Sequence, residues 1–135
     1  MPDENSPDLN DLRFLVIEDD PLAQTLAVEL LNQMGAARVD VADDGLEALN
    51  LLLIGDRPAD VLLVDLGMPD MGGAEMLRHL GRRKYAGSVI LVSGADEETL
   101  TIAQEMAKTH GLDLLGFITK PITRDALAEA LSRRA

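Results

Sequence analysis

The sequence predicts an α/β domain with a parallel β-sheet, and two observations indicate this fold class. First, short apolar runs at residues 14–17 and 61–64 have the length and the leucine and β-branched content of strands buried on both faces of a sheet. Second, segments with leucines at helical spacing separate such runs, so that strand and helix alternate along the chain. At 135 residues, of which 47% are hydrophobic, the chain has enough apolar material for one domain with a core.

The first strand and helix follow a polar lead-in. Residues 1–10 contain two prolines and several polar groups, so we expect them to be disordered and the folded domain to span 11–134. A strand is predicted at 13–18, followed by a helix that starts at Pro21 and stops before Gly35. We expect this helix to bury one apolar face, made of Leu22, Leu26, Leu30 and Met34.

Four more strand–helix pairs complete the alternation. The strands are predicted at residues 38–42, 61–65, 88–93 and 115–119. The helices that follow them are predicted at about 46–53, 73–82, 96–109 and 123–133. Glycine and proline punctuate the chain, since residues 55–58 break the second helix and residues 85–87 form a turn. The pattern favours a sheet with helices on both faces.

Acidic residues follow two of the predicted strands directly. Glu18, Asp19 and Asp20 come after the first strand, and Asp65 closes the third. Because the carboxyl ends of parallel strands open into the crevice where ligands bind, these carboxylates should meet at one end of the sheet. Carboxylates at such short distances repel each other unless a cation or a proton lies between them, so the cluster is a candidate magnesium site. Asp20 precedes Pro21 and is better placed as a helix N-cap, with ligation as the alternative.

Composition excludes several classes of protein. The chain has no cysteine, which excludes disulfides and thiolate metal sites and is compatible with a reducing cytoplasm. A net charge of −12 argues against nonspecific binding to nucleic acid or to an anionic membrane. No apolar run is long enough to span a bilayer, and the polar start is unlike a signal peptide. We therefore expect a cytoplasmic protein without direct nucleic-acid or membrane contact.

Four motifs, each at the end of a predicted strand, resemble those of the receiver domain of two-component response regulators. They are Val16-Ile17-Glu18-Asp19-Asp20-Pro21, Asp65-Leu66-Gly67-Met68-Pro69-Asp70-Met71-Gly72-Gly73, Leu91-Val92-Ser93-Gly94 and Phe117-Ile118-Thr119-Lys120-Pro121. The resemblance covers residues 12–133. It implies a flavodoxin-like (βα)5 fold with a five-stranded parallel sheet of order 2-1-3-4-5.

The resemblance implies a role for each acidic position. Asp65 corresponds to the phospho-acceptor, since a carboxylate can attack phosphorus and form an acyl phosphate. Asp19 corresponds to a direct ligand of Mg2+, for which Mn2+ could substitute, and Glu18 to a ligand acting through water. Gly67, two residues beyond the acceptor, would donate its backbone carbonyl to the metal.

Three more residues receive roles from the same resemblance. Lys120 would bring a positive charge to Asp65 and then to its phosphoryl oxygens, and the Lys120–Pro121 bond would be cis. The hydroxyl of Ser93 would donate to a phosphoryl oxygen. Phe117 stands where a receiver's switch aromatic moves inward on activation, with a plain core aromatic as the alternative.

The implied function is that of a response regulator receiver domain. Its partners would be a sensor histidine kinase or a histidine phosphotransfer protein, together with an output domain or downstream protein, and phosphorylation could drive homodimerisation. The chain itself would not be an enzyme beyond its own phosphorylation and dephosphorylation. A phosphorylation-independent interaction module is the alternative. Such modules have usually lost the acceptor aspartate or the lysine, and this chain has both. The spacing from Ser93 to Lys120 further resembles receivers attached to cyclic-di-GMP phosphodiesterase domains, with a stand-alone adaptor as the alternative.

Two rival functions conflict with single positions. A haloacid-dehalogenase-type phosphatase needs an aspartate two residues after its nucleophile, where this chain has Gly67. A nucleotide-binding module needs a glycine-rich turn after the first strand, where this chain has Glu18-Asp19-Asp20, which would repel phosphate.

Overall fold

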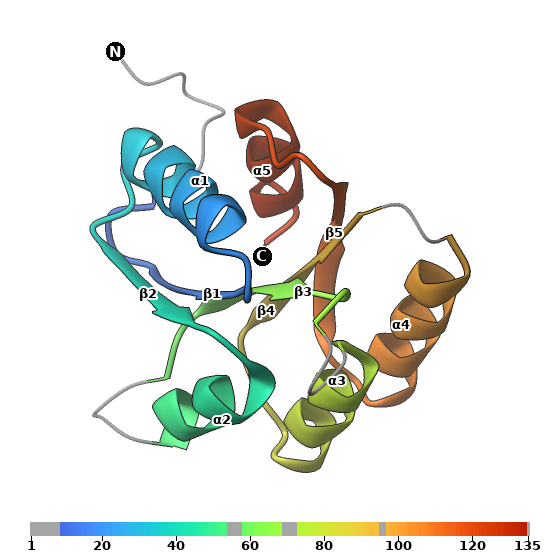
Figure 1. Ribbon diagram of the computed structural model, residues 1–135. Coiled ribbons are helices and arrows are strands. Elements are labelled where there is room, and N and C mark those ends of the chain that lie inside the picture. Colours follow the sequence, from blue (N-terminus) through green and yellow to red (C-terminus); the bar gives the residue numbers. More distant parts are fainter. Residues whose placement is uncertain (1–8, 54–57, 69–72, 95–96, 135) are drawn as a thin grey trace.

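The protein folds around a five-stranded parallel sheet, as the sequence predicts (Figure 1). The computed structural model describes residues 9–53, 58–68, 73–94 and 97–134. The sheet has the order β2-β1-β3-β4-β5. Its strands are β1 (Arg13–Ile17), β2 (Arg38–Ala42), β3 (Val61–Asp65), β4 (Ser88–Ser93) and β5 (Asp113–Thr119). The predicted order is confirmed, and β5 begins two residues before the predicted start.

Within the described residues, five helices cover the two faces of the sheet. They are α1 (Pro21–Gln33), α2 (Gly45–Leu53), α3 (Gly73–Arg82), α4 (Glu97–Thr109) and α5 (Arg124–Leu131). Helices α1 and α5 lie on one face, and α2, α3 and α4 lie on the other (Figure 1). None of the helices in the described ranges combines the length and apolarity that a membrane span requires.

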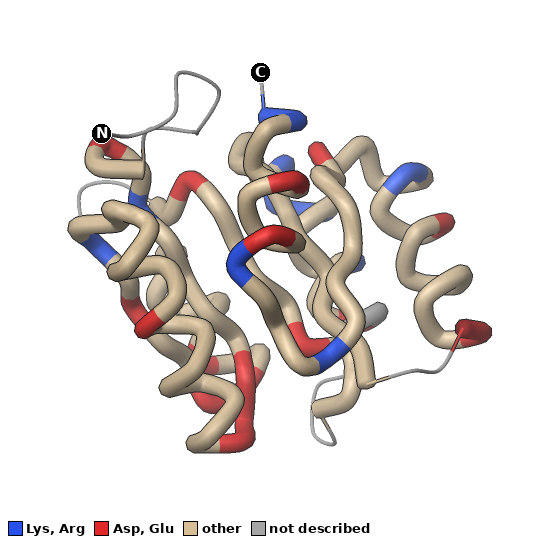
Figure 2. Tube along the Cα trace, turned by 90° about the horizontal axis from the view of Figure 1, so that it is seen from above, with Lys and Arg blue, Asp and Glu red and all other residues tan. Residues whose placement is uncertain are grey.

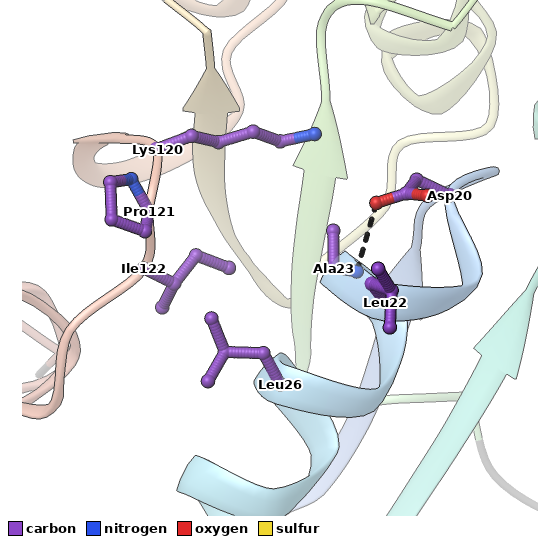
Figure 3. Close-up of a pocket in the computed structure, with 7 residues that line it drawn as sticks. All are labelled: Asp20, Leu22, Ala23, Leu26, Lys120, Pro121 and Ile122. Atoms are coloured by element: carbon purple, nitrogen blue, oxygen red, sulfur yellow. Dashed lines mark hydrogen bonds between the residues drawn. The ribbon is translucent and has the colours of Figure 1, made fainter.

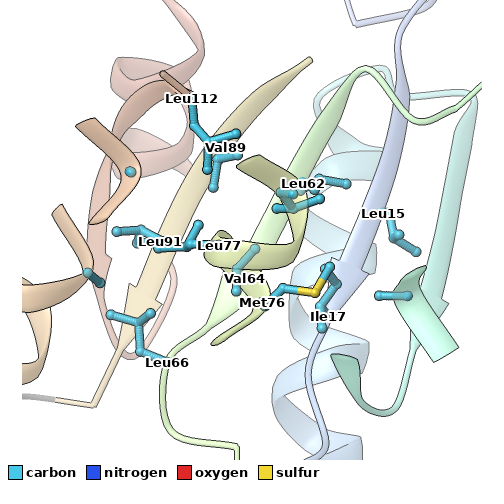
Figure 4. Packing of buried hydrophobic residues seen from close by; sticks show 14 of the residues in the cluster. Leu15, Ile17, Leu62, Val64, Leu66, Met76, Leu77, Val89, Leu91 and Leu112 are labelled. Carbon is cyan, nitrogen blue, oxygen red and sulfur yellow. The ribbon is translucent and has the colours of Figure 1, made fainter. Parts of the chain in front are cut away.

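Two hydrophobic cores result from this layering, because successive strand residues point to opposite faces of the sheet. In β1, Leu15 and Ile17 pack with α2, α3 and α4, and Figure 4 shows them together with Met76 and Leu77. Phe14 and Val16 pack on the opposite face against α1 and α5. Every residue of β3 is buried, which explains the continuous apolar run at residues 61–64.

The prediction for the apolar face of α1 is wrong in part. The fully buried residues of this helix are Ala27 and Leu31, whereas Leu22 is 81% exposed and Leu26 is 36% exposed. Ala27 and Leu31 are four residues apart and lie on one side of the helix, so the face that the sheet covers is rotated away from the leucines that the spacing selected. Leu30 and Met34 of the predicted face are only partly buried at the edge of this core.

Leu9, which the sequence assigned to the lead-in, is 1% exposed and belongs to the core beneath α1 and α5. The remaining lead-in at residues 1–8 lies outside the described residues, as do residues 55–57 of the predicted helix break and residues 69–72 of the second motif.

Candidate functional site

The carboxyl ends of β1 and β3 bring three acidic residues together. The two strands are neighbours in parallel register, with Ile17 opposite Val64, so that the residues that follow each strand meet. Carboxylate oxygens of Glu18, Asp19 and Asp65 lie within 4.8 Å of one another. Glu18 and Asp65 are buried, while Asp19 is exposed. Oxygen ligands of this kind, open to solvent on one side, suit a hard cation that keeps several of its waters.

Lys120 reaches this cluster from the loop between β5 and α5. Its Nζ lies 2.6 Å from Glu18 Oε1 and 3.4 Å from Asp65 Oδ2. Its backbone N–H donates to the carbonyl of Ser93 (2.9 Å), which ties the loop to the end of β4. The Lys120–Pro121 bond is cis, as the resemblance implied. The ammonium group therefore faces both buried carboxylates.

Burial and mutual repulsion give the two buried carboxyl groups different pKa values. Burial, with Asp65 as neighbour, raises the pKa of Glu18 to about 7. Burial also acts to raise the pKa of Asp65, but hydrogen bonds with Glu18, from the Gly67 amide and with Lys120 outweigh it and lower that pKa below its ordinary value. Burial opposes the charged form of Lys120, yet the two carboxylates raise its pKa overall. Asp65 is thus the more acidic carboxyl group of the pair.

The two carboxylate oxygens of Asp65 have different partners. The N–H of Gly67 donates to Asp65 Oδ1 (2.9 Å), whereas Oδ2 faces Lys120. Gly67 is exposed, and a Cβ added to it would lie 3.5 Å from Oδ1, an ordinary contact. The backbone of Gly67 is therefore next to the acceptor candidate, and a side chain at this position would stand beside it.

The structure places the remaining predicted residues around this centre. Ser93 is 7% exposed at the end of β4, beside Thr119 and the backbone of Lys120. Phe117 is 48% exposed on β5, so the alternative of a plain core aromatic is wrong. Asp20 caps α1 by accepting from the Ala23 N–H (3.0 Å), which confirms its predicted N-cap role.

Sequence reasoning did not select Gln24, which contacts the loop that carries the acidic pair. Its Nε2 donates to the carbonyl of Glu18 (3.1 Å) and to Asp43 Oδ1 (3.1 Å). No motif marks this residue, because its role depends on the loops after β1 and β2 lying side by side. Acidic residues gather around this end of the sheet (Figure 2), including Asp43 and Asp44 after β2.

An apolar groove borders the site on the side of α1. It has a volume of about 360 Å³ and lies between the start of α1 and the β5–α5 loop (Figure 3). The lining residues are Asp20, Leu22, Ala23, Leu26, Lys120, Pro121 and Ile122. The exposed leucines of α1 thus form one wall of a groove that ends at the acidic cluster.

Comparison with known proteins identifies relatives over nearly the whole chain. The family model for the response regulator receiver domain matches residues 14–132. The cyclic di-GMP phosphodiesterase RocR of Pseudomonas aeruginosa is 33% identical over 125 residues, which are 93% of this chain and 32% of that protein. The positive alginate biosynthesis regulatory protein of the same organism is 32% identical over 90% of this chain and 46% of its own length. The sensor protein TorS of Escherichia coli is 34% identical over 92% of this chain and 13% of its own length.

Solved structures show the same architecture. A response regulator from Colwellia psychrerythraea superposes with a TM-score of 0.74 and 31% identity, covering 92% of this chain and 94% of that one. The structure titled FixJ-N gives a TM-score of 0.74 and 28% identity, covering 92% of this chain and 93% of that one. The chain spans less than half the length of each of the three sequence relatives described above, whereas it spans nearly all of these two structures.

Proposed function

This chain belongs to the response regulator receiver domain family, and we propose that its Asp65 is the residue that accepts the phosphoryl group. A receiver domain accepts this group from a histidine kinase. One observation carries the assignment: the buried carboxylate of Asp65 lies between an ammonium group and two further acids at the carboxyl end of the sheet. The lowered pKa of Asp65 keeps it ionised at neutral pH, as a nucleophile requires.

The proposed reaction moves one phosphoryl group from a histidine to Asp65. A carboxylate oxygen of Asp65 attacks phosphorus, the new P–O bond forms as the P–N bond breaks, and the imidazole nitrogen keeps the electron pair of the broken bond. Lys120 offsets the negative charge that the phosphoryl oxygens bring to this buried position. The hydroxyl of Ser93, at the end of the neighbouring strand, is proposed to donate to one of these oxygens.

We propose Mg2+ as the cation for the acidic cluster, with Mn2+ as a substitute. The donor set fits, because Glu18, Asp19 and Asp65 offer hard oxygen ligands within 4.8 Å and the exposed backbone of Gly67 adds a carbonyl nearby. When bound, the cation supplies positive charge that neutralises the transferred group and its acceptor. Lys120, Asp65 and Ser93 bind and orient that group.

The test of the acceptor is the mass of the intact protein. Incubation with Mg2+ and a small acyl phosphate should add the mass of one phosphoryl group to the parent and none to Asp65→Asn. Asp125→Asn, which changes an exposed carboxylate on α5, is the matched control and should label like the parent. Labelling of Asp65→Asn to the parent level at another residue would show that the acceptor lies elsewhere.

We further propose that the phosphoryl donor docks in the groove beside α1. A partner that delivers a phosphohistidine to Asp65 must approach the carboxyl end of the sheet, where this groove offers exposed Leu22 and Leu26. A sensor histidine kinase or a histidine phosphotransfer protein would cover these leucines with an apolar helix face. Transfer from such a partner should therefore depend on the groove, while labelling by a small donor should not.

Two pairs of leucines make this test sharp. Leu22→Gln with Leu26→Gln should slow transfer from a phosphorylated partner about tenfold or more and leave small-donor labelling within about twofold. Leu46→Gln with Leu53→Gln is the matched control, since these leucines on α2 are 62% and 63% exposed and lie away from the groove. Equal losses in the two double variants would contradict docking at this groove.

The signal is proposed to leave the domain through β4, α4 and β5. Phosphorylation adds charge beside Ser93 and Lys120, and the exposed Phe117 on β5 is proposed to move inward as the domain switches between existing states.

We propose a cytoplasmic location. RocR supports an output of the cyclic-di-GMP phosphodiesterase type, and a stand-alone adaptor receiver is the second candidate. Phosphodiesterase activity of the full-length protein, measured before and after phosphorylation, distinguishes the two.

A further inference from the structure

We propose that Gln24 is a positioning residue that holds the Glu18–Asp19 pair in the geometry needed for cation binding, an inference that rests on the proposed magnesium site. Gln24 lies in the first turn of α1, where its own N–H donates to the carbonyl of Asp20 (2.9 Å). Asp20 also caps this turn through its side chain. The backbone that carries Gln24 is therefore firmly placed relative to the acidic loop.

The chemistry of the two contacts determines how the side-chain amide is oriented. Both partners, the carbonyl of Glu18 and Oδ1 of Asp43, are acceptors. A glutamine amide has one NH2 group with two donor hydrogens and one oxygen that can only accept. Only the NH2 group can satisfy both partners, so Gln24 links the loop after β1 to the loop after β2.

A continuous series of polar contacts connects Gln24 to Asp65 through Glu18 and Lys120. A peptide unit is planar, so holding the carbonyl of Glu18 also sets the direction of the Asp19 N–H. That N–H donates to Glu18 Oε2 (3.1 Å), while Glu18 Oε1 meets Lys120 Nζ at 2.6 Å and Lys120 meets Asp65. Gln24 therefore acts on the metal-binding carboxylates through the 18–19 peptide and without touching the acceptor.

The second contact joins Gln24 to the loop after β2, which further hydrogen bonds hold in place. The Asp43 N–H donates to Glu47 Oε2 (3.2 Å), and the Glu47 N–H donates to Asp44 Oδ1 (2.7 Å) at the start of α2. A second tie runs through the backbone, where the Glu18 N–H donates to the carbonyl of Ala42 (3.1 Å). Because Gln24 is uncharged, it supplies these donors without neutralising the carboxylates that attract the cation.

The first experiment compares the same substitution at two places in α1. Gln24→Met keeps the length of the side chain and removes both donors, and Gln33→Met makes the same change at an exposed position at the far end of the helix. The Mg2+ dissociation constant, measured by calorimetric titration of the full chain, should rise about threefold to tenfold in Gln24→Met and stay within about twofold in Gln33→Met. At saturating Mg2+ the rate of labelling from an acyl phosphate should return to the parent value.

The outcomes separate this inference from the proposed function. If the parent binds Mg2+ and Gln24→Met binds it equally well, the positioning role is refuted while the magnesium site stands. A labelling defect in Gln24→Met that persists at saturating Mg2+ also refutes it, because that result indicates general damage to the fold. Absence of Mg2+ binding by the parent overturns both the inference and the proposed metal site.

A double-mutant cycle tests the bridge to Asp43 independently. Asp43→Asn removes the charge but keeps an oxygen for Gln24, whereas Asp43→Ala removes both. Mg2+ affinity should be about twofold to fivefold weaker in Asp43→Ala than in Asp43→Asn, and this difference should vanish when Gln24→Met is also present. An equal difference with and without Gln24 would refute the bridge.

Discussion

The raised pKa of Glu18 predicts that this residue contributes less to the stability of the metal-free protein as the pH rises toward neutrality. A carboxyl group whose pKa is raised in the folded state contributes stability that is fully present below its unfolded pKa and is lost as the pH rises through its folded pKa. For Glu18 these values are 4.5 and about 7. Glu18→Gln keeps the shape of the side chain and cannot ionise, so this part of the pH dependence should disappear.

The magnitude follows from the size of the shift. Each unit of pKa shift corresponds to about 1.4 kcal/mol, so moving from 4.5 to about 7 gives an upper bound of about 3.5 kcal/mol. Because Glu18 interacts strongly with Asp65 and the buried site can relax, we expect about 2 kcal/mol. That change corresponds to roughly 6–8 °C in Tm for a domain of this size.

The assay is urea unfolding in the presence of a chelator, followed by circular dichroism, since the chain has no tryptophan. Between about pH 5 and about pH 8 the free energy of unfolding of the parent should fall by about 2 kcal/mol more than that of Glu18→Gln. Glu105→Gln, a change at an exposed position of α4, controls for the loss of one negative charge and should run parallel to the parent. Parallel curves for the parent and Glu18→Gln would refute the reasoning.

Three further predictions concern the metal, the lifetime of the phosphoryl group and the switch. Mg2+ should raise the Tm of the parent in proportion to site occupancy, and Asp19→Asn should reduce this response while raising the metal-free Tm; equal responses would argue against ligation by Asp19. Gly67→Arg should lengthen the phosphoryl lifetime several-fold, because a side chain at residue 67 stands beside Asp65 and obstructs water; phosphate release after donor removal measures this, and an unchanged or faster rate would contradict it. Phosphorylation should change hydrogen exchange most within residues 97–119, and this change should be smaller in Ser93→Ala. Changes confined to residues 38–53 would show that the signal takes another route.

Local patterns were sufficient for much of this structure. Runs such as residues 61–64 predict central strands, because a sheet covered on both faces buries every residue of a strand. The meeting of Glu18 with Asp65 then follows, since parallel neighbours end at the same edge. Asp20 before Pro21 likewise marks a helix start from sequence alone.

The errors have a common origin in packing. Periodicity identifies the leucines of α1 but not the face that packs on the sheet, which is the side of Ala27 and Leu31. For Phe117 only the alternative of a core aromatic is wrong: the neighbouring Ile118 packs beneath α1 and α5, and Phe117 points to the opposite face of the sheet, where it is 48% exposed.

The sequence by itself determined the fold class, the order of elements and the acidic residues at the strand ends, because these depend on patterns within a few residues. Tertiary structure alone decided which carboxyl group is the more acidic and which segments are tied together. The Lys120–Glu18 contact joins residues 102 positions apart, and the Gln24–Asp43 contact joins the first turn of α1 to the loop after β2. Burial, charge proximity and donor geometry act through space, and no local periodicity records them.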